Sequence, residues 1–307
     1  MKFFIILFPI FCIFIAGFIG QKTLKFDIAN LSRMSLYLLS PFLAFKTFYV
    51  HTLTSDYFYY IVYVAALCLI LVAMVSLWAK LMGYNQKERC ALILSSCFMN
   101  NGNYGTPVIL VFFGATGFDL AVIMMVLQQF IMSTIGVYYA AKGSNHLDNM
   151  SQKDVLKRVI RMPVAYGAFL GIIFQLLHVP LSKEIILAVS MIGDASVPII
   201  MLILGMQLAT IKIKHIDYPK ISFALMIRML ISPILAVGLV YFMPISLAYK
   251  EVLIVLAAMP CAANTTLLSV QFNTKPELVS SATFISTLVS LITLPIILSM
   301  INPPTIF

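Results

Sequence analysis

Apolar residues along the chain fall into blocks separated by short polar stretches. The blocks are about 17–25 residues long, the length that an α-helix needs to cross roughly 30 Å of hydrocarbon. They lack the period-2 alternation of a membrane β-barrel. This pattern predicts an all-α integral membrane protein with ten transmembrane helices. The predicted spans are residues 3–20, 34–50, 58–80, 88–114, 119–141, 162–178, 184–209, 219–243, 250–271 and 277–300.

The two halves of the chain resemble each other in their polar residues. Glu88 opens the fourth span and Asn101 follows thirteen residues later, while Glu251 opens the ninth span and Asn264 follows at the same distance. With five spans in each half, the second half would be inserted upside down relative to the first, which is the inverted-repeat construction of secondary transporters. We therefore expect a first repeat at 1–141, a loop at 142–161 and a second, inverted repeat at 162–307.

Composition and charge agree with a membrane protein. The chain is 62% apolar and 10% charged, whereas soluble domains contain roughly 25% charged residues. The net charge of +9 does not indicate a nucleic-acid partner, because the basic residues lie in short connections: fifteen on one side and four on the other. The positive-inside rule then places both termini outside the cytoplasm and the loop 142–161 inside.

Two spans are interrupted by residues that form helices poorly. The fourth contains the run Asn100–Pro107, with three amides, two glycines and a proline, and the ninth contains Pro260–Thr266. Within hydrocarbon, broken backbone is tolerated only where protein or a water-filled cavity can satisfy it. We expect the two broken helices to cross near the midplane of the bilayer. Their half-helix N-termini would suit an anion, and their freed carbonyls and amides would suit a cation.

The candidate binding residues follow from these breaks and from polar groups deep in the other spans. They are Asn100, Asn101, Gly102, Asn103, Gly105, Pro107, Pro260, Asn264, Thr265, Thr266, Gln128 and Arg228, with Asp194 as the candidate for ion coupling.

Two of these residues carry formal charges, and more than one role stays open for them. Arg228 could hold a substrate carboxylate, and Asp194 could bind Na⁺ or carry a proton. Alternatively, the two side chains pair with each other and lock the seventh and eighth spans together. Lys46, near the outer end of the second span, is expected to extend to the membrane interface.

Three segments resemble the auxin efflux carrier family: Asn100–Pro107, Pro198–Ala209 and Pro260–Ser269. This family includes bacterial malate and malonate permeases, and the resemblance covers essentially the whole chain. It implies a fold like that of the bile-acid/sodium symporters, with a scaffold of spans 1, 2, 6 and 7 and a core of spans 3–5 and 8–10. A homodimer through the scaffold is left open. The long hydrophilic loop of the plant carriers is absent, which favours a small carboxylate over auxin.

The sequence therefore predicts a secondary transporter of a small organic anion, malate-, malonate- or auxin-like, that works by elevator-type alternating access. Its partners would be this anion and the lipid bilayer. We expect no cofactor, no metal, because the four histidines fall in connections, and no enzymatic activity, because Asp194 is the one acid deep inside a span. The motif GxxxxGK[ST] is absent, so energy would come from an ion gradient or from that of the substrate itself. The resemblance implies a bacterial inner (plasma) membrane. Na⁺ coupling, H⁺ coupling and uniport stay open. The alternative is a coupled carrier of a bile-acid-like or neutral solute, and a channel is less favoured because no filter motif is present.

Overall fold

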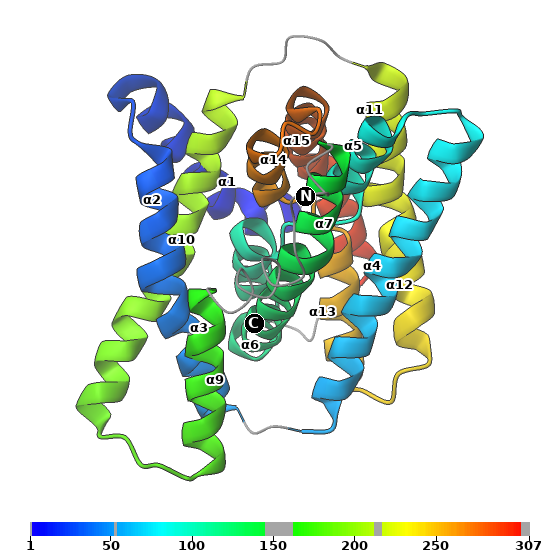
Figure 1. Cartoon of the computed structure of the whole chain (residues 1–307). Helices are drawn as coiled ribbons and strands as arrows, with labels where there is room; N and C mark the ends of the chain where they lie inside the picture. Colours follow the sequence, from blue (N-terminus) through cyan, green and yellow to red (C-terminus); the bar gives the residue numbers. More distant parts are fainter. Residues whose placement is uncertain (1, 52–53, 145–161, 212–216, 302–307) are drawn as a thin grey trace.

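The computed structural model of the chain is all-helical, as the sequence predicts (Figure 1). It describes residues 2–51, 54–144, 162–211 and 217–301, and these residues form no β-strand beyond one isolated bridge. Most of the predicted loop 142–161 lies outside the described residues. The segments long and apolar enough to cross a membrane are Leu7–Leu24, Asp56–Leu81, Asn101–Gly143, Lys183–Thr210, Tyr218–Tyr241 and Pro276–Met300. The prediction of an α-helical membrane fold is confirmed.

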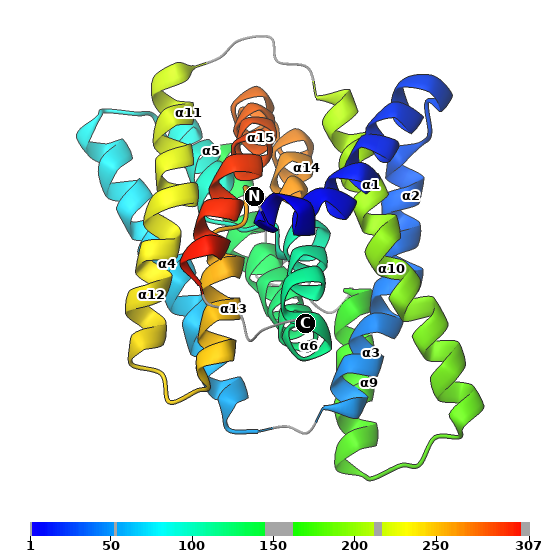
Figure 2. The ribbon, with the colours of Figure 1, turned by 180° about the vertical axis from the view of Figure 1, so that it is seen from behind.

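The first helix group lies along one side of the molecule in both views (Figure 1, Figure 2). Within it α1 packs along α10, and α3 packs between α9 and α10. The π-helical turn η1 joins α2 to α3 without a break in the helical path. The members of the group are α1 (Lys2–Leu24), α2 (Ile28–Met34), η1 (Ser35–Leu39), α3 (Ser40–Val50), α9 (Pro163–Leu176) and α10 (Lys183–Thr210).

The remaining helices form the second helix group, in which α6 and α14 lie nearest the first group and α4 and α12 lie farthest from it (Figure 1). Its first part is α4 (Asp56–Leu81), α5 (Gln86–Ser96), η2 (Asn101–Gly105), α6 (Thr106–Ile131), η3 (Met132–Gly136) and α7 (Val137–Gly143). Its second part is α11 (Tyr218–Leu225), η5 (Met226–Ile231), α12 (Ser232–Tyr241), α13 (Leu247–Ala257), α14 (Ala263–Gln271) and α15 (Pro276–Met300).

A positive φ angle marks the place where the sequence predicts the fourth span to end. Gly114, inside α6, has φ +66° and ψ −160°, so the helical path is interrupted there. Only glycine adopts this conformation without steric cost. The predicted boundary at 114–119 therefore corresponds to a real change in backbone direction.

One carboxylate ties three helix ends of the second group together. Glu88 closes a capping box with Asn85 at the start of α5, in which each backbone N–H donates to the other residue's side chain. The Glu88 carboxylate also accepts from Lys275 at 2.7 Å and lies 3.3 Å from the Nζ of Lys220. Since Lys275 precedes α15 and Lys220 belongs to α11, these contacts fix the ends of α5, α11 and α15 against each other.

The first helix group packs through glycines that allow close backbone approach. A Cβ on Gly17 would lie 2.2 Å from the carbonyl oxygen of Leu202, and one on Gly205 would lie 2.0 Å from that of Phe14. In lipid no hydrophobic force drives helices together, so van der Waals contact between closely spaced backbones contributes much of the free energy of helix association. The α1–α10 contact thus depends on the absence of side chains at these two positions.

We expect Gly205→Ala to destabilise the protein by about 1–3 kcal/mol, because the added methyl group forces the backbones of α1 and α10 apart. Thermal unfolding of the purified protein in detergent should show a lower melting temperature. Gly238→Ala is the matched control, since a Cβ there meets no atom within 4 Å. Equal melting temperatures for Gly205→Ala and the unchanged protein would contradict this view of the α1–α10 contact.

Candidate functional site

The two interrupted segments meet through their backbones. The helix α5 ends at Ser96 and α13 ends at Ala257, and the segments 97–100 and 258–262 that follow them lie side by side in opposite directions. We call these two segments the paired breaks. The Asn100 N–H donates to the Pro260 carbonyl at 3.0 Å, and the Ala262 N–H donates to the Phe98 carbonyl, also at 3.0 Å. Each break thus satisfies backbone groups that the other releases, as a hydrocarbon environment requires.

Neighbouring side chains complete these bonds. Ser286, on α15, accepts the N–H of Cys261 at 3.1 Å, and the Cys261 thiol donates to the Ser95 carbonyl at 2.7 Å. Gly105 lies so close to α13 that a Cβ would approach a methyl carbon of Leu256 to 2.8 Å. The paired breaks are therefore held firmly within the second helix group.

Three side-chain amides at the breaks and on α6 are buried without a hydrogen-bond partner. Asn100 is 4% exposed, Asn101 1% and Gln128 3%. The side-chain nitrogen of Asn100 and both polar atoms of Asn101 and of Gln128 lack a partner. Burying an unpaired amide costs roughly 1–3 kcal/mol, so such groups are uncommon unless they serve another purpose. Their placement makes them the strongest candidates for ligand contact among the predicted residues.

Asn101 lies next to the boundary with the first helix group. The turn η2, which contains Asn101, contacts α10. The ring of Tyr104 in η2 packs on Phe14 of α1, with the ring centroids 5.2 Å apart, and its hydroxyl accepts a bond from Ser290 at 2.9 Å. A solute bound at Asn101 would therefore be near both helix groups.

The other predicted residues in and after the breaks differ in their surroundings. Asn264 at the start of α14 is partly exposed and is free to contact a solute. Thr265 is buried and donates to the Ala262 carbonyl at 2.7 Å, and the hydroxyl of Thr266 lies 3.2 Å from that of Thr283. The two threonine hydroxyls are thus engaged in bonds within the protein.

The remaining members of the predicted set lie in or shortly after the two breaks. Gly102 and Asn103 are partly exposed, and Gly105 and Pro107 are buried at the start of α6. Pro260 contributes its carbonyl to the paired breaks. The predicted residues of η2, the start of α6 and the start of α14 thus follow the paired breaks along the chain.

Arg228, on η5, is fully buried and lies against the end of α13. Its Nη2 donates to the Ser232 hydroxyl and, at 2.5 Å, to the carbonyl of Ala257, the last residue of α13. A cation at this position stabilises the negative end of the helix dipole. Its Nε and Nη1 have no partner, and no carboxylate among the described residues forms an ion pair with it. The arginine thus supplies a positive charge beside the paired breaks that no acid among the described residues pairs with.

The alternative in which Arg228 pairs with Asp194 is wrong. Asp194 accepts from the Nζ of Lys46 with both carboxylate oxygens at 2.8 Å. Lys46, which we expect from the sequence to extend to the membrane interface, is bonded to this acid on α10, and its position relative to the interface stays a prediction. The lysine and the aspartate come from spans far apart in the sequence, so no local pattern indicates their contact.

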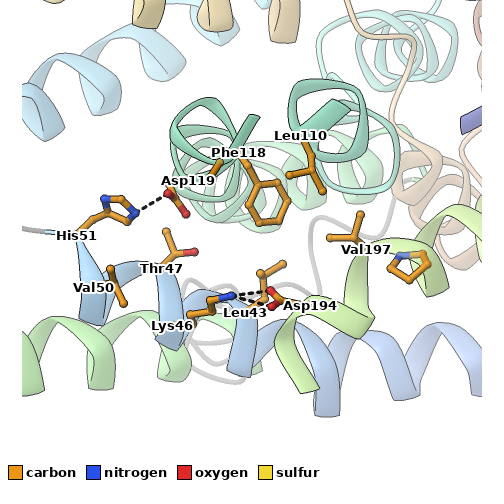
Figure 3. Close-up of a pocket in the computed structure, with 12 residues that line it drawn as sticks. Leu43, Lys46, Thr47, Val50, His51, Leu110, Phe118, Asp119, Asp194 and Val197 are labelled. Carbon is orange, nitrogen blue, oxygen red and sulfur yellow. Dashed lines mark hydrogen bonds and ion pairs between the residues drawn. The ribbon is translucent and has the colours of Figure 1, made fainter. Parts of the chain in front are cut away.

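Asp194 and Lys46 line a cavity of about 440 Å³ between α3, α6 and α10 (Figure 3). A second pair, His51 and Asp119, lines the same cavity. His51 directly follows α3 and Asp119 lies on α6, and the His51 Nε2 is 2.5 Å from a carboxylate oxygen of Asp119. No sequence pattern indicates this pair, because each residue lies at the end of a predicted span. This cavity, between helices of both groups, is separate from the paired breaks.

An all-helical membrane chain in which two interrupted helices satisfy each other and leave polar side chains free is built like a solute transporter. Residues 2–298 match the family model described as "Membrane transport protein". The chain therefore belongs to this family, the auxin efflux carrier family that its motifs resemble.

Two relatives of archaeal origin agree with this assignment. The chain is 26% identical over 291 residues to an uncharacterized transporter of Methanothermobacter thermautotrophicus, an alignment that covers 92% of this chain and 90% of that protein. It is 30% identical over 206 residues to an uncharacterized transporter of Methanocaldococcus jannaschii, which covers 66% of this chain and 65% of that protein. The protein is thus a membrane transporter.

Replacing Arg228 by methionine separates a structural from a functional role. The Ala257 carbonyl keeps a bond from Ser232 at 2.9 Å, and exchanging an unpaired buried charge for an apolar residue is often neutral or stabilising. We expect Arg228→Met to keep or raise the melting temperature while lowering carboxylate uptake into liposomes about tenfold or more. Arg33→Met, at an exposed position, is the control. A lower melting temperature with unchanged uptake per folded molecule would show that Arg228 is purely structural.

Proposed function

We propose that this transporter carries a small organic anion and binds it at the paired breaks. The observation that supports this most is the set of buried, unpaired amides of Asn100, Asn101 and Gln128. They offer hydrogen-bond donors to a solute that reaches the breaks. An anion would compensate them more fully than a neutral solute, because hydrogen bonds to charged groups are the stronger ones.

The charges around the breaks favour an anion. The helices η2–α6 and α14 both begin there, and the N-terminus of a helix carries a partial positive charge. Arg228 adds a full positive charge behind the end of α13, with no acid paired to it. The helix ends of α5 and α13 contribute the opposite sign, but Arg228 offsets that of α13. A mono- or dicarboxylate of the malate or malonate kind, or an auxin-like acid, fits this field.

We further propose the architecture of two inverted repeats of five spans. The corresponding placement of the two breaks, each after a short helix of eleven residues, supports it. In this architecture α5 and α13 enter from opposite faces of the plasma membrane and the paired breaks lie near its midplane. Both chain termini would face outward and the loop 142–161 would face the cytoplasm, in agreement with the distribution of Lys and Arg.

The transport step would be a movement of the second helix group against the first, in the manner of an elevator. The paired breaks belong to the second group, while η2 contacts α10 of the first. A sliding of this boundary would expose the amides to one side of the membrane and then to the other. The first group, with its tight glycine contacts, would serve as the scaffold and as the surface through which a homodimer forms.

The alternative is a Na⁺- or H⁺-coupled carrier of a neutral or bile-acid-like solute, which the uncharged amides also fit. Asp194 remains the candidate for ion coupling, and its role would require that the bond to Lys46 opens during the cycle. Uniport needs no such step. The ion dependence of uptake separates these modes.

We expect Asn101→Ala and Asn264→Ala to reduce carboxylate uptake to background in proteoliposomes, while both variants remain folded. Each substitution removes amide groups at the start of a half-helix without altering the backbone contacts of the breaks. Uptake of labelled malate, malonate, succinate and indole-3-acetate would be measured with and without Na⁺ and a pH gradient.

Gln271→Ala, an amide exposed at the end of α14, is the control and should transport normally. Uptake near normal in both asparagine variants would refute a binding site at the paired breaks. Saturable uptake of a neutral solute, with none of any acid, would favour the alternative instead.

A further inference from the structure

The cavity between α3, α6 and α10 combines charged groups with an apolar wall (Figure 3). Its charged residues are the two pairs Lys46–Asp194 and His51–Asp119. Its volume of about 440 Å³ falls in the range of small-molecule sites, which are mostly apolar with a few placed polar groups. The apolar side chains that line it are Leu43, Val50, Leu110, Phe118 and Val197.

All four polar side chains of the cavity are partly exposed. Lys46 is 32% exposed, Asp194 53%, His51 39% and Asp119 24%. Pairs with this much exposure contribute little to stability where water can solvate the separated partners. Another carboxylate could therefore replace either aspartate at small cost.

Lys46 and His51, which bring nitrogen donors to the cavity, come from the same end of α3. Lys46 lies on α3 and His51 follows its last residue, five positions further along the chain, which corresponds to about 7.5 Å along a helix axis. Figure 3 shows both groups directed toward the cavity, each toward the aspartate that pairs with it. The acids thus occupy the places that a ligand carboxylate would take.

We propose that this cavity is a second carboxylate site, distinct from the paired breaks, in which Lys46 and His51 are the anion-binding residues. When no ligand is bound, the carboxylates of Asp194 and Asp119 occupy the ligand's place. The ligand is a carboxylate with a short carbon body, for which the apolar wall provides contact. This inference rests on the proposed transport of an organic anion, since such a site would collect the solute before it reaches the breaks.

Binding here would also act on the boundary between the helix groups. The Lys46–Asp194 pair joins α3 to α10, both within the first group. The His51–Asp119 pair joins the end of α3 to α6 and so connects the two groups. A ligand carboxylate that takes the bond of His51 therefore releases one tie between them, and arrival of the solute favours their separation.

Variants of the acids and of the lysine should change affinity in opposite directions. The measurement is equilibrium binding of radiolabelled malonate to the full-length protein in lipid nanodiscs, with an Asn101→Ala background to suppress binding at the paired breaks. Lys46→Gln should weaken binding about tenfold, the equivalent of one charge-assisted hydrogen bond, and Asp119→Asn and Asp194→Asn should each strengthen it about fivefold by removing the competing carboxylate. A purely structural role would weaken binding in all three.

The matched controls are the same types of substitution, Asp→Asn and Lys→Gln, at residues that do not line the cavity. Asp56→Asn, at the partly exposed start of α4, and Lys183→Gln, at the exposed start of α10, should leave the Kd unchanged. The inference is overturned if the aspartate variants bind malonate more weakly or equally, or if neither they nor the unmodified chain bind it saturably. If Lys46→Gln does not fold, the two aspartate variants decide the question alone.

Uptake assays on the same proteins, without the Asn101→Ala change, keep the two proposals apart. Malonate binding that follows the predicted order, in a protein that transports no anion, would support the second site and refute the proposed function. Carboxylate transport that depends on Asn101, with a malonate affinity that does not change in the Asp119 and Asp194 variants, would support the proposed function and refute the second site.

Discussion

The structure depends on one constraint: backbone groups released from a helix inside a membrane must find partners there. The paired breaks meet it through bonds between Asn100 and Pro260 and between Ala262 and Phe98. Their closeness accounts for the glycine at position 105, which leaves room for Leu256. It also accounts for the basic residue behind α13, since the carbonyl of Ala257 is left without a partner in its own helix and accepts from Arg228.

Because backbone groups bond to each other across the breaks, the side chains of the breaks stay available to bind a solute. The amides of Asn100 and Asn101 are buried yet unpaired, and the turn η2 that follows lies against α10. The paired breaks are therefore complete in these backbone bonds but leave unpaired amides close to the first group. Such amides can bind water or a solute when the boundary between the groups moves. The family assignment as a membrane transport protein is in keeping with this division of roles.

The sequence predicts the helical fold and the presence of two breaks, because both have local causes; the breaks themselves lie at 97–100 and 258–262, at or just before the start of the two predicted runs. Apolar block length sets the spans, and Asn, Gly and Pro weaken the helices at Asn100–Pro107 and Pro260–Thr266 whatever surrounds them. The family resemblance is carried by these same segments.

What the sequence did not predict is the choice of partners between helices. The contact of Lys46 with Asp194, and of His51 with Asp119, depends on which helices are neighbours and how each is rotated. A pair between Asp194 and Arg228 is one of the roles that the sequence leaves open. The two residues instead lie in different surroundings: Asp194 lines the cavity, and Arg228 is fully buried beside α13.

The central claim is that the two helix groups move relative to each other when a solute is carried. Spin labels on Lys183→Cys of α10 and Leu247→Cys of α13, both at exposed positions, with the exposed Cys12 replaced by serine, would report this distance by pulsed electron resonance in nanodiscs. The account predicts at least two distances whose populations shift when a transported carboxylate is added. A single distance, unchanged by solute in a protein that still transports it, would contradict the account.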